Sequence, residues 1–443
     1  MRRLAAIALL FLLSACRLLH AQPFWLTAYE FPGGPKTALA GLGDSCLLAG
    51  LANGILRSTD GGEHWSPVLQ SSFIFSLHAR PGGLVLAGGA GRIFVSPDAG
   101  QHWDSVLLDA PYPVAEFAHT PDGALFACTS GLDPLLGYVG AGVYRSADGG
   151  LSWSRRNTGL GGLSCDQLAA DAEGRIYTTV RDELASGAGG LYVSSSQGLN
   201  WTQIPIRIDG QGVIVNEIQA IRAAGLYISP QDSLYISLEG VADNVAVQLN
   251  LCKALGDLHR PGFWRRIQVL SSPAWWMDWL LQDMHQARNG DLYSSLPGSL
   301  AMGGTWYRPA GGAWDRYTAG LGLDAAGLYS PQQHYELSNG RIFMIQYLDE
   351  RIYKTDKSRL LTGGGPPDEM PRLAYPNPAR AGEWIYLPAA GRLAPDAVFL
   401  TDLQGRRLPA EVQPGMPLAI RMPGTPGMCL LHHPGGVQRI LIR

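Results

Sequence analysis

The sequence has few charged residues and no dense basic run, and these scarcities narrow its possible functions. Only 16% of its 443 residues are Asp, Glu, Lys or Arg, and the formal net charge is −3. Because nucleic-acid-binding proteins cluster cationic side chains against phosphates, we expect no nucleic-acid partner. Beyond the first residues no stretch reaches about 18 uninterrupted apolar residues. We therefore expect no transmembrane helix in the mature chain.

Cysteine is also scarce. The cysteines form no CxxC pair and have no histidine at the spacing of a metal site, so the sequence predicts neither a metal nor another cofactor. We interpret most of them as small buried apolar residues. A single disulfide bond is the alternative for two of them, if the protein resides in an oxidising compartment. The six are Cys16, Cys46, Cys128, Cys165, Cys252 and Cys429.

The first residues have the order of a secretory signal peptide. Arg2 and Arg3 precede an apolar run over residues 4–13, and small residues follow. We expect residues 1–21 to be this signal, with cleavage after Ala21, and the mature protein to be secreted or displayed on the outer cell surface. The run that ends in Cys16 resembles a bacterial lipobox, so a lipoprotein anchored at Cys16 is the alternative.

One motif recurs at intervals of about 40–50 residues, which is typical of a β-propeller. Its Asp and Ser oxygens can accept hydrogen bonds from turn amides, its Gly supplies a positive φ, and its Trp packs between neighbouring sheets. A fourth copy, over residues 194–201, has Ser196 in place of Asp. The full copies of Ser-x-Asp-x-Gly-x-x-Trp are Ser58, Asp60, Gly62 and Trp65; Ser96, Asp98, Gly100 and Trp103; and Ser146, Asp148, Gly150 and Trp153.

A second element, a turn followed by an aliphatic and aromatic run, occurs seven times between Leu48 and Phe343 at a mean spacing of about 49 residues. With the Trp motif it describes a four-stranded antiparallel sheet, the blade of a propeller. We therefore predict an all-β chain with a seven-bladed propeller over residues 22–361, six or eight blades being the alternatives.

The ends of this repeat array predict how the ring closes. The seventh unit ends near Asp356 without a Trp strand, whereas a spare β-prone segment that contains Trp25 precedes the first unit. Since propellers must protect their sheet edges, we expect the N-terminal segment to complete the last blade.

The Trp motif resembles the Asp-box, or BNR, repeat of sialidases, some endoglucanases, sortilin-type receptors and a photosystem assembly factor. That resemblance implies a propeller and no particular chemistry. The Arg-Ile-Pro signature of sialidases is absent. A glycanase would need two acidic residues facing one groove. The acidic residues we considered for this role are Asp171, Asp182, Glu183, Glu239 and Asp243.

An aromatic stretch between the fifth and sixth units can be interpreted in two ways. Trp264, Trp275, Trp276 and Trp279 could project from the rim and bind sugars or proteins. Alternatively, Trp264 belongs to the outer strand of blade five, and the others begin blade six and are buried.

A Gly/Pro linker over residues 362–370 separates the propeller from a short β-rich region over residues 371–443. This region resembles the type IX secretion sorting domain of Bacteroidota. The resemblance implies a small Ig-like β-sandwich that the type IX secretion machinery recognises. The residues that match the sorting motif are Tyr375, Pro376, Asn377 and Pro378, followed by Asp402, Gly405 and Arg406.

Together these features predict an exported propeller that binds a protein or glycan partner and is sorted through its C-terminal domain. No residue in the sequence is identified as catalytic. A sialidase-like or endoglucanase-like glycoside hydrolase is the alternative function.

Overall fold

The structure is a computed structural model that describes most of residues 24–355 and shorter stretches between residues 384 and 442. Within residues 24–355, the residues outside the description are 31–35, 183–185, 208–217, 230–232, 243–244, 256–262, 267–280, 297–302, 311, 313, 324–326 and 348. The described residues contain strands and turns and no helix.

Phe24–Asp356 form one compact unit of seven four-stranded antiparallel sheets, which confirms the seven-bladed propeller. Blades one to three are β2 to β5 (Lys36–Leu42, Cys46–Leu51, Gly54–Ser58, Ser66–Gln70), β6 to β9 (Ser76–Ala79, Val85–Gly88, Arg92–Ser96, Asp104–Leu107) and β10 to β13 (Val114–His119, Leu125–Asp133, Gly137–Ser146, Ser154–Arg155). Blades four and five are β14 to β17 (Cys165–Ala170, Ile176–Val180, Gly190–Ser194, Thr202–Ile204) and β18 to β21 (Gln219–Ile228, Leu234–Ala242, Val245–Leu255, Phe263–Arg266). Blade six is β22 to β25 (Asp283–Gln286, Leu292–Leu296, Gly304–Arg308, Asp315–Tyr317), and blade seven combines β26 to β28 (Pro331–Glu336, Ile342–Gln346, Arg351–Thr355) with β1 (Trp25–Glu30).

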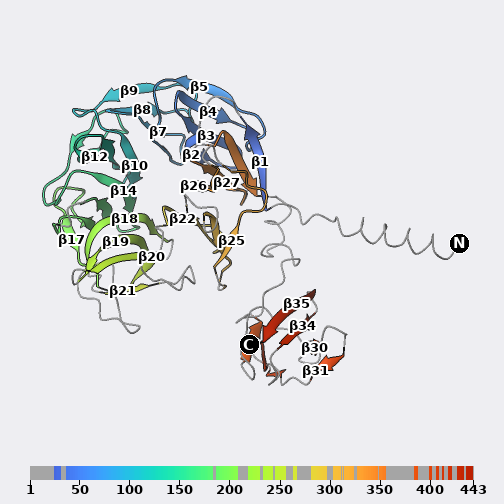
Figure 1. Cartoon of the computed structure of the whole chain (residues 1–443). Helices are drawn as coiled ribbons and strands as arrows, with labels where there is room; N and C mark the ends of the chain where they lie inside the picture. The colour runs from blue at the N-terminus through green and yellow to red at the C-terminus, as the bar shows by residue number, and fades with distance from the viewer. Residues whose placement is uncertain are drawn as a thin grey trace. The chain divides into compact units, whose positions relative to one another are not determined.

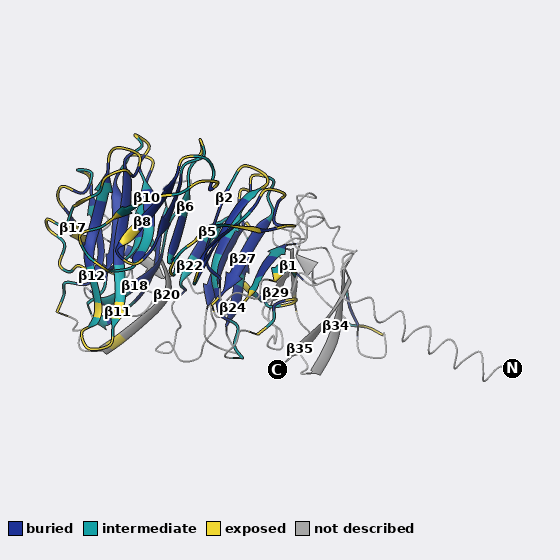
Figure 2. Ribbon diagram, turned by 90° about the horizontal axis from the view of Figure 1, so that it is seen from above, coloured by how far each residue is buried: buried dark blue, intermediate teal, exposed yellow. Residues whose placement is uncertain are grey.

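The first strand of each blade lies nearest the propeller axis. Figure 1 shows β2, β10, β14, β18, β22 and β26 around the centre and β5, β9, β17 and β21 at the rim. The second strands are largely buried because a neighbouring blade covers each of their faces. In β15, for example, every residue from Ile176 to Val180 is buried. Figure 2 shows this pattern of buried strands and exposed connections.

The N-terminal strand closes the ring, as the sequence predicted. β1 pairs antiparallel with β28, with Trp25 opposite Thr355 and Glu30 opposite Arg351. Trp25 is fully buried among residues of blades six and seven, including Tyr293, Tyr307 and Tyr353. The last blade is therefore built from both ends of the propeller segment.

Large aromatic side chains fill the spaces between adjacent blades. Trp65 of blade one packs with Phe343 of blade seven, and Trp201 of blade four packs with Phe126 of blade three. Trp264 lies on the outer strand β21 and is fully buried, which agrees with its interpretation as a blade-five residue. Residues 275–279 lie outside the described residues, so the interpretation of the other tryptophans stays a prediction.

The two faces of the propeller differ in their connections. The turn face carries the short turns between first and second strands, such as 43–45, and the Trp-motif turns between third and fourth strands, such as 59–65. The loop face carries the connections between second and third strands, such as 134–136, and the links between blades, such as 156–164.

The C-terminal region forms a separate unit with two antiparallel sheets. One sheet contains β29 (Trp384–Leu387), β32 (Val412–Gln413) and β33 (Leu418–Arg421). The other contains β30 (Phe399–Thr401), β31 (Arg407–Leu408), β34 (Gly427–His433) and β35 (Gly436–Ile442). The predicted sorting residues 375–378, 402 and 405 lie outside the described residues, and the exposed Arg406 precedes β31.

Candidate functional site

The Trp motif of blade one is a self-contained turn on the turn face. Ser58 Oγ donates to Asp60 Oδ1 at 2.8 Å and accepts from the Gly62 amide at 2.9 Å. Asp60 Oδ1 also accepts from the amides of Glu63 and His64, each at 3.0 Å. Trp65 Nε1 donates to the Gly62 carbonyl at 3.1 Å. The Ser, Asp and Trp side chains of the motif therefore use their polar groups to hold the turn.

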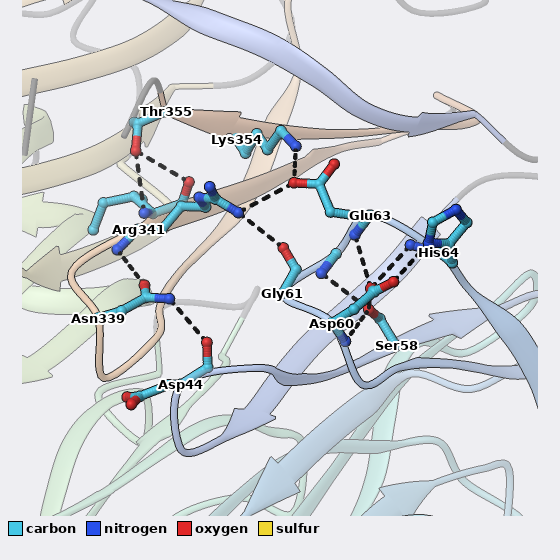
Figure 3. Close-up of polar contacts among 12 residues, drawn as sticks. Asp44, Ser58, Asp60, Gly61, Glu63, His64, Asn339, Arg341, Lys354 and Thr355 are labelled. Carbon is cyan, nitrogen blue, oxygen red and sulfur yellow. Dashed lines mark hydrogen bonds and ion pairs between the residues drawn. The ribbon is translucent and has the colours of Figure 1, made fainter. Parts of the chain in front are cut away.

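The same turn attaches blade one to blade seven, as Figure 3 shows. Arg341 Nη1 donates to the Gly61 carbonyl at 3.1 Å and lies 3.4 Å from Glu63 Oε1. Lys354 Nζ lies 2.7 Å from the same carboxylate oxygen. Asn339 Nδ2 donates to the Asp44 carbonyl at 2.9 Å. These contacts lie at the seam where the ring closes.

The next two copies repeat this geometry. Asp98 and Asp148 accept from Ser96 and Ser146 at 2.8 and 2.7 Å, and the Gly100 amide donates to Ser96 Oγ at 2.8 Å. The corresponding contacts of Gly150, Trp103 and Trp153 are also present. The hydroxyls of Ser152 and Ser146 are the main donors that lower the pKa of Asp148, to about 2. Hydrogen bonding of the ionised form explains this direction.

In the fourth copy the hydroxyl of Ser196 replaces the Asp carboxylate and is a weaker hydrogen-bond acceptor. Ser196 Oγ accepts from one turn amide, that of Asn200, at 3.0 Å, while the Leu199 amide donates to the Ser196 carbonyl at 3.1 Å. Trp201 Nε1 donates to the Arg156 carbonyl in blade three instead of to its own turn. In this copy the tryptophan therefore forms its hydrogen bond outside its own turn.

Of the acidic residues proposed for a glycanase, Asp171 and Asp182 lie on opposite faces of the propeller. Asp171 and Asp182 lie beyond opposite ends of β15, on the turn face and the loop face respectively. Asp171 is buried and pairs with Arg175 at 2.5 Å, and Asp182 accepts from Ser186 Oγ at 2.8 Å. Glu239 lies on β19 opposite Arg222. Residues 183 and 243 lie outside the described residues.

A different acidic pair meets near the propeller axis. Glu116 is on β10 of blade three and Asp283 is on β22 of blade six. Burial and then the negative charge of Asp283 raise the pKa of Glu116 to about 8. Asp283 Oδ2 accepts from both the backbone amide and Nδ1 of His334, each at 2.8 Å. At neutral pH the Glu116 carboxyl is therefore mostly protonated.

Two histidines also face each other across adjacent first strands. His78 Nε2 lies 2.9 Å from His119 Nδ1, which joins β6 to β10. Burial, followed by the charges of His119 and Arg80, lowers the pKa of His78 to about 3. The His78 imidazole is therefore neutral at physiological pH.

A mixed polar cluster lies on the loop face at blades three and four. Asp166 Oδ2 accepts from Nη2 and Nε of Arg181 at 2.8 and 3.1 Å, and its Oδ1 accepts from Ser130 Oγ at 2.5 Å. The Arg181 guanidinium also stacks on Tyr138, with 3.6 Å between its central carbon and the ring centroid. Both charges of this ion pair are mostly buried, at 9% and 18% exposure.

Sequence reasoning missed Glu116, Asp283, Asp166, Arg181 and Arg222. Each carries charge on or just beyond one of the first two strands of a blade, for example Glu116 between Ala115 and Phe117. A charged side chain at an inner-strand position is the signal that could have indicated them.

The described residues contain neither a metal-binding cluster nor a helix that could span a membrane. In this part of the chain no three His, Cys, Asp or Glu side chains are placed to hold a metal. Nor does it contain a helix of the length and apolarity that crossing a membrane requires. Cys46, Cys128 and Cys165 are free thiols, and the latter two are buried as the sequence indicated.

Comparisons with known proteins support the fold alone. No protein-family model matches the chain, and no curated protein matches it significantly. Among solved structures, a GH74 xyloglucanase from Xanthomonas campestris is similar with a TM-score of 0.52 at 16% identity, over 74% of this chain and 53% of that one. YCF48 from Cyanidioschyzon merolae is similar with a TM-score of 0.51 at 13% identity, over 75% of this chain and 99% of that one. The chain thus spans about half the length of the xyloglucanase, and both likenesses concern the propeller architecture.

Proposed function

We propose that the protein is an exported propeller of the outer cell surface or medium that binds a protein or glycan partner through its loop face. The observation that carries this proposal is the distribution of exposed large apolar side chains. Among the described residues, Leu132, Leu135, Leu136, Tyr138 and Leu163 are exposed on the loop face at blades three and four. Apolar groups that gather on an exposed surface are typical of an interaction site.

The structural use of the Trp-motif turns supports the same proposal. Their Asp, Ser and Trp side chains are hydrogen-bonded within the turn or to the adjacent blade. They hold the scaffold, so the recognition surface is expected on the opposite face, where the connections vary in length.

Binding is tested by applying the purified full-length protein to a glycan array and by cross-linking it to the isolated surface proteins of the producing bacterium. Hydrolysis of a fluorogenic sialoside and of β-glucans is followed alongside. Retention without turnover supports the binding function, and the matched control is the double variant Leu135→Ser/Leu136→Ser. Turnover, or the absence of any retained molecule, would contradict it.

A glycoside hydrolase is the second candidate, favoured by the axial carboxyl pair. Glycoside hydrolysis needs two carboxyl groups, one of which acts as a general acid, and the raised pKa of Glu116 beside Asp283 suits that role. In this case Glu116→Gln would abolish turnover, whereas Glu63→Gln, which changes a carboxylate on the turn face, would leave it unchanged.

We also propose that residues 371–443 act as the sorting domain for the type IX secretion machinery. The strands of this region coincide with several segments of the motif resemblance. A periplasmic reporter followed by residues 371–443 is then expected at the cell surface or in the medium, and the chain ending at residue 370 is expected to stay in the periplasm. If Cys16 is lipidated instead, radioactive palmitate will label the native chain and not Cys16→Ser.

A further inference from the structure

Arg222, near the loop-face end of β18, has no partner for its guanidinium among the described residues. Its Nε is buried without a hydrogen-bond acceptor, and no hydrogen bond, ion pair or ring contact involves its other nitrogens in that part of the chain. Burial and the nearby Arg181 lower the pKa of Arg222. Buried donors are nearly always satisfied, so the unsatisfied Nε of Arg222 requires an explanation.

Other arginines with an unpartnered Nε show why Arg222 differs from them. Arg80, Arg145, Arg156 and Arg341 each donate a hydrogen bond from a second nitrogen. Arg308 stacks on Trp314 at 5.5 Å. Among the described arginines of this kind, Arg222 has neither type of contact.

The acceptors around Arg222 are occupied or make no ion pair with it. Both oxygens of Asp166 already accept, from Arg181 and from Ser130. Glu239 lies opposite Arg222 in the β18–β19 pairing and interacts with it electrostatically, but the described residues show no ion pair between them. An incoming carboxylate would find the donors of Arg222 free.

An apolar hairpin lies beside this group. Leu132 on β11 is directly opposite Tyr138 on β12, and Tyr138 is the ring that Arg181 covers. At the tip, Leu135 and Leu136 are 93% and 76% exposed, and both of their amides donate to Asp133 Oδ1, at 2.8 and 3.0 Å. The exposed colouring at the end of β11 in Figure 2 marks this hairpin. The turn is hydrogen-bonded in a conformation that displays two leucines.

We infer that the loop face at blades three to five binds an extended peptide segment in which an acidic side chain lies close to large aliphatic side chains. The inference rests on the proposed binding function and names the chemistry of the partner. Arg222 would receive the carboxylate in a bidentate pair, and the leucines of the hairpin would cover the aliphatic side chains.

Two observations favour a peptide carboxylate over other anions. Asp166 and Glu239 lie close to Arg222 and would repel a multiply charged phosphate more than a single carboxylate. The exposed side chains are mainly leucines, which lack the flat faces that stack on sugars, and Arg181 already covers Tyr138. Acidic glycans are therefore not the ligand we infer, and their retention is measured in the test as a competing result.

The test uses purified full-length protein on an array of synthetic decapeptides that contain leucine and one Asp or Glu. Each peptide is paired with its Asn or Gln counterpart, and glucuronate-containing and sialylated glycans are printed beside them. We expect retention of acidic peptides, and affinity about tenfold or more weaker for Arg222→Gln and for Leu135→Ser/Leu136→Ser. Arg222→Lys is expected to recover part of the binding, because it restores the charge without the bidentate geometry.

Matched controls separate the site from general surface effects. Arg92→Gln removes an exposed arginine of β8, and Leu107→Ser removes an exposed leucine of β9. Both are expected to bind like the native protein. Because the hairpin leucines are exposed, their double variant should fold normally, so a loss of binding in it reports on recognition.

Three results would overturn the inference. They are equal retention of the amide peptides, unchanged affinity of Arg222→Gln, and retention of acidic glycans without peptides. If no peptide is retained while the glycan array or the cross-linking identifies a partner, the peptide site is wrong and the proposed function stands. If neither experiment retains anything, both are wrong.

Discussion

The ammonium group of Lys354 lies 2.7 Å from Oε1 of Glu63, a residue 291 positions earlier in the chain. The contact lies where β28 of the last blade meets the Trp-motif turn of the first. The other side of blade seven contains Trp25, which the β1–β28 pairing places in the core between blades six and seven. Charge pairs and apolar burial thus act together at the closure of the ring, and their contributions can be separated by mutation.

Trp25→Ala tests the apolar part of the closure. The side chain is fully buried among aromatic residues, so its removal leaves a large cavity between blades six and seven. We expect a loss of about 3–5 kcal/mol in the free energy of unfolding, measured by urea titration. Leu107→Ala, at an exposed position of β9, is the control and should cost little. A loss below about 1 kcal/mol for Trp25→Ala would contradict the role of β1.

Glu63→Gln tests how much the ion pairs contribute to the closure of the ring. The Glu63 side chain is 49% exposed, and solvent screens its ion pairs with Lys354 and Arg341. We expect Glu63→Gln to lower the free energy of unfolding by about 0–1 kcal/mol. This loss should become smaller in high salt, because salt screens the ion pairs of the native protein. A change as large as that of Trp25→Ala would show that the seam depends mainly on charge.

Ser196→Asp is expected to stabilise blade four. In blades one and two a single Asp oxygen accepts from two turn amides, whereas Ser196 Oγ accepts from one. Restoring the carboxylate should raise the free energy of unfolding by about 0.5–1.5 kcal/mol, measured as a shift in Tm. Ser154→Asp adds the same charge on exposed β13 and is the control. Equal shifts in both variants would mean that charge alone, not turn geometry, is responsible.

Glu116 should make stability fall as the pH rises from about 6.5 to 8. Its pKa is about 8 in the folded chain, whereas an unfolded Glu has a pKa of about 4.3. In this window the unfolded state binds fewer protons, so the free energy of unfolding falls, by at most ~1.4 kcal/mol per pH unit.

Other shifted groups titrate outside that window. His78, with its pKa lowered to about 3 in the folded chain, affects stability only below about 6.5. Lys36, with its pKa lowered to about 8 by burial, affects it at higher pH. Glu116→Gln should therefore flatten the profile of Tm against pH between 6.5 and 8. An unchanged slope in this variant would place the titrating group elsewhere.

The fold could be predicted because each blade repeats the same local physics. Asp60, Asp98 and Asp148 occur at the same position of equivalent turns, and the apolar second strands follow at regular intervals. Even the closure was predictable, because a strand was missing after residue 356 and spare before residue 30. Such regularities are local in sequence, and a single chain displays them.

The site residues could not be predicted in this way, because they meet only in three dimensions. Glu116 and Asp283 belong to blades three and six, and Arg181 and Arg222 to adjacent blades. Nothing in the repeat specifies which side chains approach one another across the axis or at the loop face. Conversely, Asp171 looked available in the sequence, yet the structure uses it in a buried ion pair with Arg175.

The pairing of β1 with β28 also sets the order of assembly. β1 is synthesised first among the propeller strands, and its partner is synthesised last, so the ring can close only after residue 355 has been made. Until then Trp25 has no complete blade to enter, and the longest-range contacts of the fold must form last. A truncated chain therefore keeps an open edge and an unburied tryptophan, features that promote aggregation and proteolysis. Ring closure thus distinguishes finished molecules from unfinished ones.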